Sequence, residues 1–476
     1  MKYEAVIGLE VHVELSTKSK IFCGCTTEFG GKPNSHVCPI CLGLPGTLPR
    51  LNRRVVEYGI KAGLALNCSI TEKCRMDRKN YFYPDCPKSY QITQQDFPLC
   101  KNGYIDIELN NGETKRIEIE RIHVEEDAGK QLHTAEGTLV DFNRAGVPLI
   151  EIVSRPDIRN PEEATLYLEK LRIILSSLGV SDCKMEEGSL RCDGNISIRP
   201  EGSSEFGVKS ELKNMNSFKA LEKALKYEFN RQVETLKNGH KLFSETRRWD
   251  EGNNVTVVMR SKEEARDYRY FPEGDLVTLN ISNEWIEEIK KTIPELPHDK
   301  AERFVKEYGI PKYDGKVLTL SMAMAEFFEA AAKKCGDGKA VSNWLMGDIS
   351  RIMNERAIKV EGLKFTPIHL AELVTLINEG VISNNIGKKI IEEMFISGKS
   401  PKSIVEEKGL VQNSNEETIL ESVRKVLGDN HKIVQDYKSG KTKVVGFLVG
   451  LVMKETKGKA NPQIVNKLVN EELIKL

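Results

Sequence analysis

The chain has 476 residues, of which 39% are hydrophobic and 29% are charged, and its 70 Lys and Arg residues balance its 70 Asp and Glu residues. This length allows two or three domains, and the zero net charge excludes a globally basic nucleic-acid-binding protein, so any basic patch must be local. The N-terminus lacks the apolar core of a signal peptide, and the longest apolar run, 444–453, is too short to span a bilayer. With eleven cysteines, we expect a reducing, cytoplasmic location, no membrane contact, and thiols that are free or metal-bound.

The first predicted element is a strand at residues 5–15, in which apolar and polar residues alternate. Gly8, Glu10, His12 and Glu14 fall on one face, and the apolar residues fall on the other. Carboxylate and imidazole groups are ligands for divalent cations. A half-exposed strand with ordinary polar residues has the same pattern, so this stretch alone leaves both interpretations open.

Two close pairs of cysteines follow the strand. Cys23 and Cys25 form the first pair, and Cys38 and Cys41 form the second. Zn²⁺ prefers four thiolates in a tetrahedron and each pair can supply half of them, so the spacing predicts a structural zinc site. The first pair is Cys-x-Cys, which departs from the usual Cys-x-x-Cys. His36 is an alternative ligand, and four free thiols are the alternative to a metal site.

Residues 52–67 have the apolar spacing of an amphipathic helix. The next stretch, 78–95, is predicted to be a loop because it contains Pro84 and Pro87. Its aromatic side chains can stack on a base, and Lys79 can meet a phosphate or a carboxylate. A packed surface loop is the alternative interpretation.

Strand patterns predominate from residue 101 to 155. One strand carries on a single face Arg121, His123, Glu125 and Asp127. Another has Glu151 as the one carboxylate of an apolar run, which is costly unless that group is paired or metal-bound. Three strands with inward carboxylates therefore predict a cage for Mg²⁺ and the phosphates of a nucleotide.

Further along the chain, one helix is predicted to begin at Pro161, with its apolar stripe at 164–178, and another is predicted at 217–237. A strand between them places Asp193 on a polar face. Two stretches, 246–250 and 259–273, are dense in Arg. Such stretches suit either the lining of a channel for an anionic substrate or a solvated network of ion pairs.

Helical spacing replaces the strand patterns near residue 294, and six helices are predicted before a break at 409–415. The last segment, 421–476, has 11 Lys and Arg residues against 6 Asp and Glu residues. Such a local excess can hold an RNA backbone, although a plain solvated face has the same composition.

Five motifs spread along the chain carry a resemblance to one family. They are residues 7–15, 38–46, 80–85, 141–149 and 267–273. On these motifs the chain resembles the B subunits of bacterial tRNA-dependent amidotransferases, the GatB/GatE family, essentially from end to end. The tail, with its Gly458-Lys-Ala-Asn-Pro-Gln motif, resembles a YqeY-like domain.

This resemblance implies an α+β fold with a large mixed-sheet cradle domain at 1–293, an all-α helical domain at 294–408 and a small YqeY-like tail at 409–476 that contacts tRNA. It also implies a carbon–nitrogen ligase that uses ATP to phosphorylate the side-chain carboxylate of misacylated Glu-tRNA(Gln) or Asp-tRNA(Asn) and then amidates it. An A subunit would release the ammonia from glutamine, and a small C subunit would complete the heterotrimer. The sequence contains no motif of a Ser-based amidase, which agrees with that division of labour.

Together with the residues, the resemblance suggests a role for each candidate. We expect Glu10, His12, Glu125 and Glu151 to bind Mg²⁺ and ATP. Asp127 and Asp193 are expected behind these ligands, Lys79 is expected to neutralise a phosphate, and the four cysteines are expected to hold Zn²⁺. A non-catalytic, zinc-containing tRNA-binding module and a stand-alone ligase with its own ammonia source are the competing hypotheses.

Overall fold

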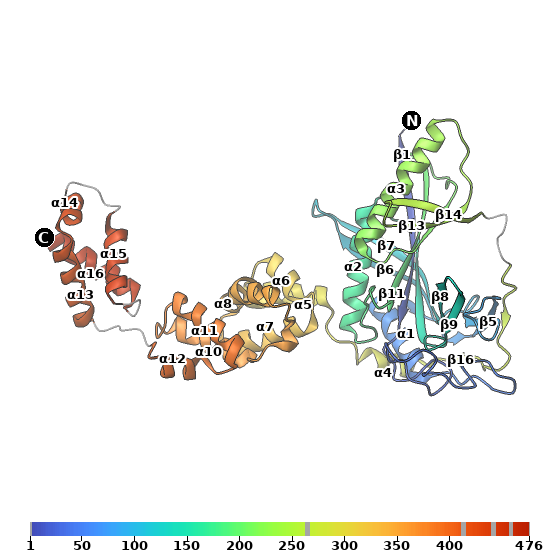
Figure 1. Ribbon diagram of the computed structural model, residues 1–476, viewed down its shortest axis with the longest axis horizontal. Helices are drawn as coiled ribbons and strands as arrows, with labels where there is room; N and C mark the ends of the chain where they lie inside the picture. Colours follow the sequence, from blue (N-terminus) through green and yellow to red (C-terminus); the bar gives the residue numbers. More distant parts are fainter. Residues whose placement is uncertain (1, 262–266, 411–415, 439–443, 457–459, 476) are drawn as a thin grey trace. The chain divides into compact units, whose positions relative to one another are not determined.

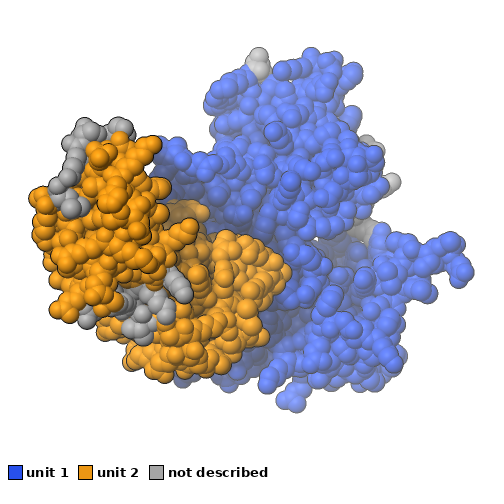
Figure 2. All heavy atoms as spheres, turned by 60° about the vertical axis from the view of Figure 1, so that its left-hand side comes forward, with its two compact units in different colours: residues 1–296 blue, residues 297–476 orange. Residues whose placement is uncertain are grey.

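The computed structural model describes residues 2–261, 267–410, 416–438, 444–456 and 460–475. The chain divides into two compact units, residues 1–296 and residues 297–476 (Figure 2). Part of the Arg-rich stretch 259–273, and several lysines of the basic tail, lie outside the described residues. In the part of the chain that is described, no helix combines the length and the apolar character needed to cross a membrane.

A nine-stranded mixed sheet forms the centre of the first unit. Its strands, in spatial order, are β14 (Val255–Ser261), β13 (Glu245–Asp250), β12 (Ser210–Lys213), β11 (Leu190–Pro200), β1 (Tyr3–Glu14), β10 (Pro148–Ser154), β7 (Thr114–Glu126), β6 (Cys100–Glu108) and β2 (Ser69–Ile70). Strands β12 and β13 are parallel, and the other neighbours are antiparallel. The opening strand of the chain therefore lies in the middle of the sheet, with four strands on either side.

One face of this sheet is apolar and is covered by helices. Helices α1 (Arg53–Ala65), α2 (Pro161–Ser177) and α3 (Phe218–Lys237) contact its strands (Figure 1). Ile7, Leu9 and Val11 of β1 are fully buried, and each contributes roughly 1.5–3 kcal/mol to folding. Because successive side chains of a strand point to opposite faces of the sheet, the polar residues of β1 lie on the face opposite the helices. A functional site can form on that face.

The predicted loop at 78–95 is wrong at both of its ends. Strands β4 (Asp77–Asn80) and β5 (Tyr90–Thr93) pair there, and β15 (Phe271–Pro272) joins β4 on its other edge. Both prolines lie in the connection between β4 and β5, so they end the strands without preventing them. Pairing with a strand almost two hundred residues away has no signal in the local sequence.

The remaining elements of the first unit are short. Strand β3 (Lys73–Cys74) pairs with β16 (Leu279–Asn280), β8 (Lys130–Thr134) pairs with β9 (Gly137–Asp141), and α4 (Asn283–Lys290) is the last helix. The cradle with a mixed sheet and attached helices agrees with the predicted α+β class.

The described residues of the second unit form helices joined by turns and short loops. Its helices are α5 (Pro297–Tyr308), α6 (Lys312–Leu318), α7 (Met322–Cys335), α8 (Gly338–Trp344), α9 (Ser350–Glu355), α10 (Pro367–Asn378), α11 (Asn384–Ser397), α12 (Pro401–Lys408), α13 (Glu416–Asp429), α14 (His431–Lys438), α15 (Val444–Glu455) and α16 (Pro462–Lys475). A π-helical turn, Leu345–Ile349, joins α8 to α9. One apolar core involves α5 to α12 and a separate one involves α13 to α16, which agrees with the predicted helical domain and small helical tail.

Candidate active site

The strand register places three side chains in one row across the polar face of the sheet. His12 on β1 is paired with Glu151 on β10, and Glu151 is paired with His123 on β7. Glu125 lies two residues along β7 from His123 and therefore points to the same face. Residues that are more than 100 positions apart in the sequence thus become immediate neighbours.

These four side chains form a compact cluster around one carboxylate. Glu151 Oε2 lies 3.4 Å from His12 Nε2 and 3.3 Å from His123 Nε2. Glu125 Oε1 lies 3.9 Å from His12 Nε2, and the Thr93 hydroxyl donates a hydrogen bond to Glu125 Oε2 at 3.1 Å. One ligand atom each of His12, Glu125 and Glu151 lies within 4.8 Å of the others. One imidazole and two carboxylates form a donor set that suits Mg²⁺ or Mn²⁺.

The imidazoles and carboxylates of the cluster shift one another's pKa values. Burial alone would lower the pKa of His123, but Glu151 and Glu125 outweigh this effect and raise it to about 9. Burial would raise the pKa of Glu151, but the two imidazoles hold it well below its ordinary value. Protons on the imidazoles thus compensate the buried carboxylates, and a divalent cation can supply the same compensation.

Glu10 belongs to a second acidic group on the same face. It is paired in register with Asp193 on β11, and ligand atoms of Glu10, Asp193 and Glu211 lie within 4.8 Å of one another. Lys213 donates to Asp193 and, at 2.9 Å, to Glu211 Oε1. Asn195 Nδ2 donates to Glu10 Oε1 at 2.8 Å. The single shell of four ligands expected from the sequence is therefore divided between two neighbouring groups.

The first group borders a cavity of about 640 Å³ through His12 and Glu125, and Lys213, which contacts the second group, also lines this cavity. Charged side chains that line it include His12, Lys79, Glu125, Asp127, Arg191 and Lys213. Burial lowers the pKa of Lys79, but Glu125 and other anionic groups more than offset this and raise it, so Lys79 keeps its charge. Asp127 accepts a hydrogen bond of 2.6 Å from Arg191 Nη2, and no ligand group of the described residues includes it.

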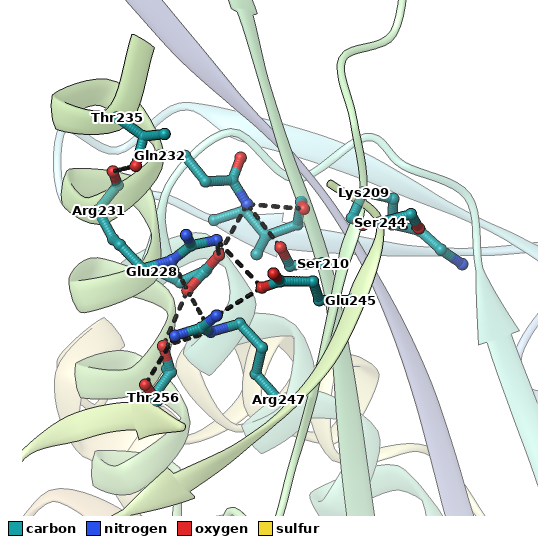
Figure 3. A network of polar contacts seen from close by, with 11 residues as sticks. Lys209, Ser210, Glu228, Arg231, Gln232, Thr235, Ser244, Glu245, Arg247 and Thr256 are labelled. Atoms are coloured by element: carbon teal, nitrogen blue, oxygen red, sulfur yellow. Dashed lines mark hydrogen bonds and ion pairs between the residues drawn. The ribbon is translucent and has the colours of Figure 1, made fainter. Parts of the chain in front are cut away.

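A buried polar network holds strand β13 in place. This strand contacts Glu211 on the neighbouring strand β12. The Thr246 hydroxyl donates to Glu211 Oε2 at 2.8 Å, and the next residue, Arg247, points into the network shown in Figure 3. There the fully buried carboxylate of Glu228 accepts two hydrogen bonds from Arg231, at 2.7 and 2.9 Å, and one from Thr256 at 2.9 Å. Arg247 Nε lies 3.4 Å from Glu228 Oε2. The Arg-rich stretch 246–250 thus places Arg247 in a buried network, which neither interpretation of the sequence anticipated.

The four cysteines come together as the sequence spacing implied. Their Sγ atoms lie within 4.8 Å of one another, and tetrahedral zinc with Zn–S bonds of about 2.3 Å needs separations of roughly 3.8 Å. The Cys38 amide donates to Cys41 Sγ at 3.2 Å. A hydrogen bond from Cys23, together with the positive charge of Lys20, lowers the pKa of Cys41 to about 4. His36 is not part of the group, so the four thiols alone fit a zinc ion.

Three residues of the site received no role from the sequence, although signals for them were present. His123 belongs to the second His-Val-Glu motif of the chain, and Glu211 and Lys213 share one face of a short strand. Asp193, which was expected behind the ligands, is a member of the second acidic group.

Comparisons with known proteins agree with this architecture. The family model described as the GatB/GatE catalytic domain matches residues 5–287, and the one described as the GatB domain matches residues 326–473. The chain is 74% identical over 476 residues to the B subunit of the aspartyl/glutamyl-tRNA(Asn/Gln) amidotransferase of Clostridium botulinum strain Loch Maree, and 71% identical over 475 residues to the protein of the same name from strain Eklund 17B. In each comparison, 100% of both chains is covered.

Proposed function

The chain belongs to the GatB/GatE family, and from that premise we propose that it is the B subunit of an aspartyl/glutamyl-tRNA(Asn/Gln) amidotransferase. In this role it activates the side-chain carboxylate of Glu-tRNA(Gln) or Asp-tRNA(Asn). A carboxylate oxygen attacks the γ-phosphorus of ATP, which gives an acyl phosphate and ADP. Ammonia then attacks the acyl carbon, phosphate leaves and a proton is lost, and the product is Gln-tRNA(Gln) or Asn-tRNA(Asn).

The observation that carries this proposal is the group of His12, Glu125 and Glu151, which lines one cavity together with Lys79 and has a second acidic group next to it on the same face of the sheet. Phosphoryl transfer depends on positioning and on charge neutralisation more than on a protein nucleophile. His12, Glu125 and Glu151 suit one Mg²⁺ ion, and Glu10, Asp193 and Glu211 suit a second. When bound, these ions neutralise the charge of the transferring phosphoryl group. Lys79, on β4, adds a positive charge to the cavity lining.

The other subunits and tRNA complete the reaction. The A subunit releases ammonia from glutamine, and the small C subunit holds the heterotrimer together. The cysteine group holds a structural Zn²⁺ that stiffens the cradle, and the YqeY-like tail contacts tRNA. Because the acyl phosphate reacts with water, the cavity must exclude water while ammonia enters.

The test measures ATP hydrolysis by the purified heterotrimer with Mg²⁺, misacylated Glu-tRNA and free ammonium, which bypasses the glutaminase. We expect hydrolysis that depends on the tRNA and yields Gln-tRNA. Glu125→Ala and Glu10→Ala should lower this rate at least about 100-fold, with tRNA affinity nearly unchanged. Glu120→Ala is the matched control, because Glu120 is exposed on the same strand as Glu125.

Two outcomes would contradict the proposal. If Glu125→Ala or Glu10→Ala reacted at the wild-type rate, the acidic groups would have no part in the reaction. If the wild-type assembly hydrolyses no ATP in any combination of tRNA and nitrogen source, the chain is a non-catalytic, zinc-containing tRNA-binding module.

A further inference from the structure

Lys20 is a fully buried lysine that lies beside the cysteine group. Its Nζ atom lies 3.7 Å from Cys41 Sγ and donates a hydrogen bond of 3.3 Å to the carbonyl oxygen of Phe142. Among the described residues, these are the only hydrogen-bonding partners of Nζ, and no carboxylate forms an ion pair with it. Among the described residues, the thiol of Cys41 is therefore the one hydrogen-bonding partner of Lys20 Nζ that can carry a negative charge.

A buried ammonium group without a counter-charge is costly. Without a metal ion, Cys41 is the one thiol of the group that contacts Lys20 among the described residues, so the group offers Lys20 at most one negative charge there. Four thiolates on Zn²⁺ carry a net charge of −2, which is itself costly in a partly buried site and is relieved by a neighbouring cation. The burial of Lys20 beside Cys41 therefore suits a metal-loaded cysteine group, in which the ammonium offsets part of the net negative charge.

Lys20 also connects the cysteine group to the active site. Its partner Phe142 begins the turn 142–146, and the stem of Lys20 lies close to Gly146 within that turn. The carbonyl of Gly146 accepts from the Ile21 amide at 2.9 Å, and the Gly146 amide donates to the Asp127 carbonyl at 2.9 Å. Cys41, Lys20 and the turn thus form a continuous series of contacts that ends at Asp127 on the cavity wall.

We propose that Lys20 is the counter-ion of the zinc-loaded cysteine group and holds the turn 142–146 in place beside the active site. This inference rests on the proposed zinc site. It makes Lys20 a positioning residue, which acts through Cys41 and Phe142 and touches no substrate. Loss of its charge should weaken zinc binding, and loss of its hydrogen bond should loosen the turn.

The first test compares zinc retention by the full chain in its heterotrimer. Zinc is measured by elemental analysis and by its rate of transfer to a chromogenic chelator, for wild type, Lys20→Met and Lys18→Met. Lys20→Met keeps the approximate volume and removes the charge, and Lys18 is an exposed lysine two residues away. We expect about 10- to 100-fold weaker zinc affinity for Lys20→Met, which is the usual effect of removing a group that supports a metal ligand. For Lys18→Met we expect no change.

A second measurement separates a counter-ion from a residue that only fills space. Thermal unfolding is followed for wild type and Lys20→Met, with zinc bound and after zinc removal. A counter-ion predicts that Lys20→Met is less stable than wild type with zinc, and that this difference is smaller without zinc, because the metal-free cysteine group carries less negative charge. Hydrogen exchange of the turn 142–146 should be faster in the zinc-loaded variant than in the zinc-loaded wild type.

The outcomes distinguish the role proposed for Lys20 from the proposed zinc site. Wild-type zinc affinity in Lys20→Met, or destabilisation of equal size with and without zinc, would overturn the role of Lys20 and leave the zinc site standing. A wild-type heterotrimer that binds no zinc would overturn the zinc site itself, and the inference with it.

Discussion

Glu151 and His123 face each other across strands β10 and β7, with Glu151 Oε2 3.3 Å from His123 Nε2. His12 approaches the same oxygen from β1 at 3.4 Å, so one carboxylate is bracketed by two imidazoles. This arrangement binds protons or a metal ion, but not both at once, because a metal-ligating imidazole must give up its proton.

The first prediction concerns the pH dependence of metal binding. The pKa of His123 rises from 6.5 to about 9, so without metal its proton stabilises the fold fully below pH 6.5, and this contribution is lost as the pH rises through 9. A divalent cation held by His12, Glu125 and Glu151 replaces the compensating charge of His123 and repels its proton, so Mn²⁺ affinity should increase from pH 6.5 to 9. Calorimetric titrations of the protein with Mn²⁺ across this pH range measure the affinity. His123→Asn should show a shallower dependence, and an affinity independent of pH in the wild type would contradict the arrangement.

The second prediction concerns Lys213, whose ammonium compensates Asp193 and Glu211. Without divalent cations, Lys213→Met should lower the free energy of unfolding by about 1 kcal/mol, a discounted value because a third of the side chain is exposed. Saturating Mg²⁺ should reduce this loss, since the ion replaces the missing charge. Urea denaturation with and without Mg²⁺ measures both quantities. A loss that Mg²⁺ leaves unchanged would argue against a cation site in this group.

The third prediction concerns the network in Figure 3. Glu228→Ala leaves the half-buried Arg231 and the buried Arg247 without their shared carboxylate and should cost about 3–5 kcal/mol of stability. Glu228→Gln should cost less, because it keeps an acceptor oxygen. Glu234→Ala, at an exposed position of the same helix, serves as the control in the same denaturation experiment. A change below about 1 kcal/mol for Glu228→Ala would show that the network does not anchor β13.

The fourth prediction concerns Lys79. Lys79→Met should lower kcat for ATP-dependent amidation about 100- to 1,000-fold, because it removes a preorganised positive charge from the cavity. Its effect on KM for tRNA should be small. Steady-state kinetics with ammonium as the nitrogen source provide the measurement, and Lys73→Met, at an exposed position on β3, is the comparison. A change in KM for ATP alone would assign Lys79 to nucleotide binding rather than to phosphoryl transfer.

The local sequence was enough to predict the strand at 5–15, the helix at 52–67 and the cysteine pairs, because alternation, helical spacing and short ligand spacing are properties of neighbouring residues. The face on which Glu10 and His12 lie followed from the two-residue period of a strand. The α+β class and the family followed from motifs spread over the chain. The loop prediction at 78–95 failed because its two prolines lie in the connection between β4 and β5, and because the second partner of β4 is β15, far along the chain.

Tertiary structure decided how the site residues are grouped. The sequence placed all four predicted ligands on inward faces. Only the register of β1 against β10 and β11 shows that Glu10 lies beside Asp193 and that His12 lies beside Glu151. A shift of one residue would send every side chain to the other face, and burial of the apolar face under the helices prevents that shift. The contacts of Lys20 likewise depend on a turn more than 100 residues away, so no local pattern could reveal them.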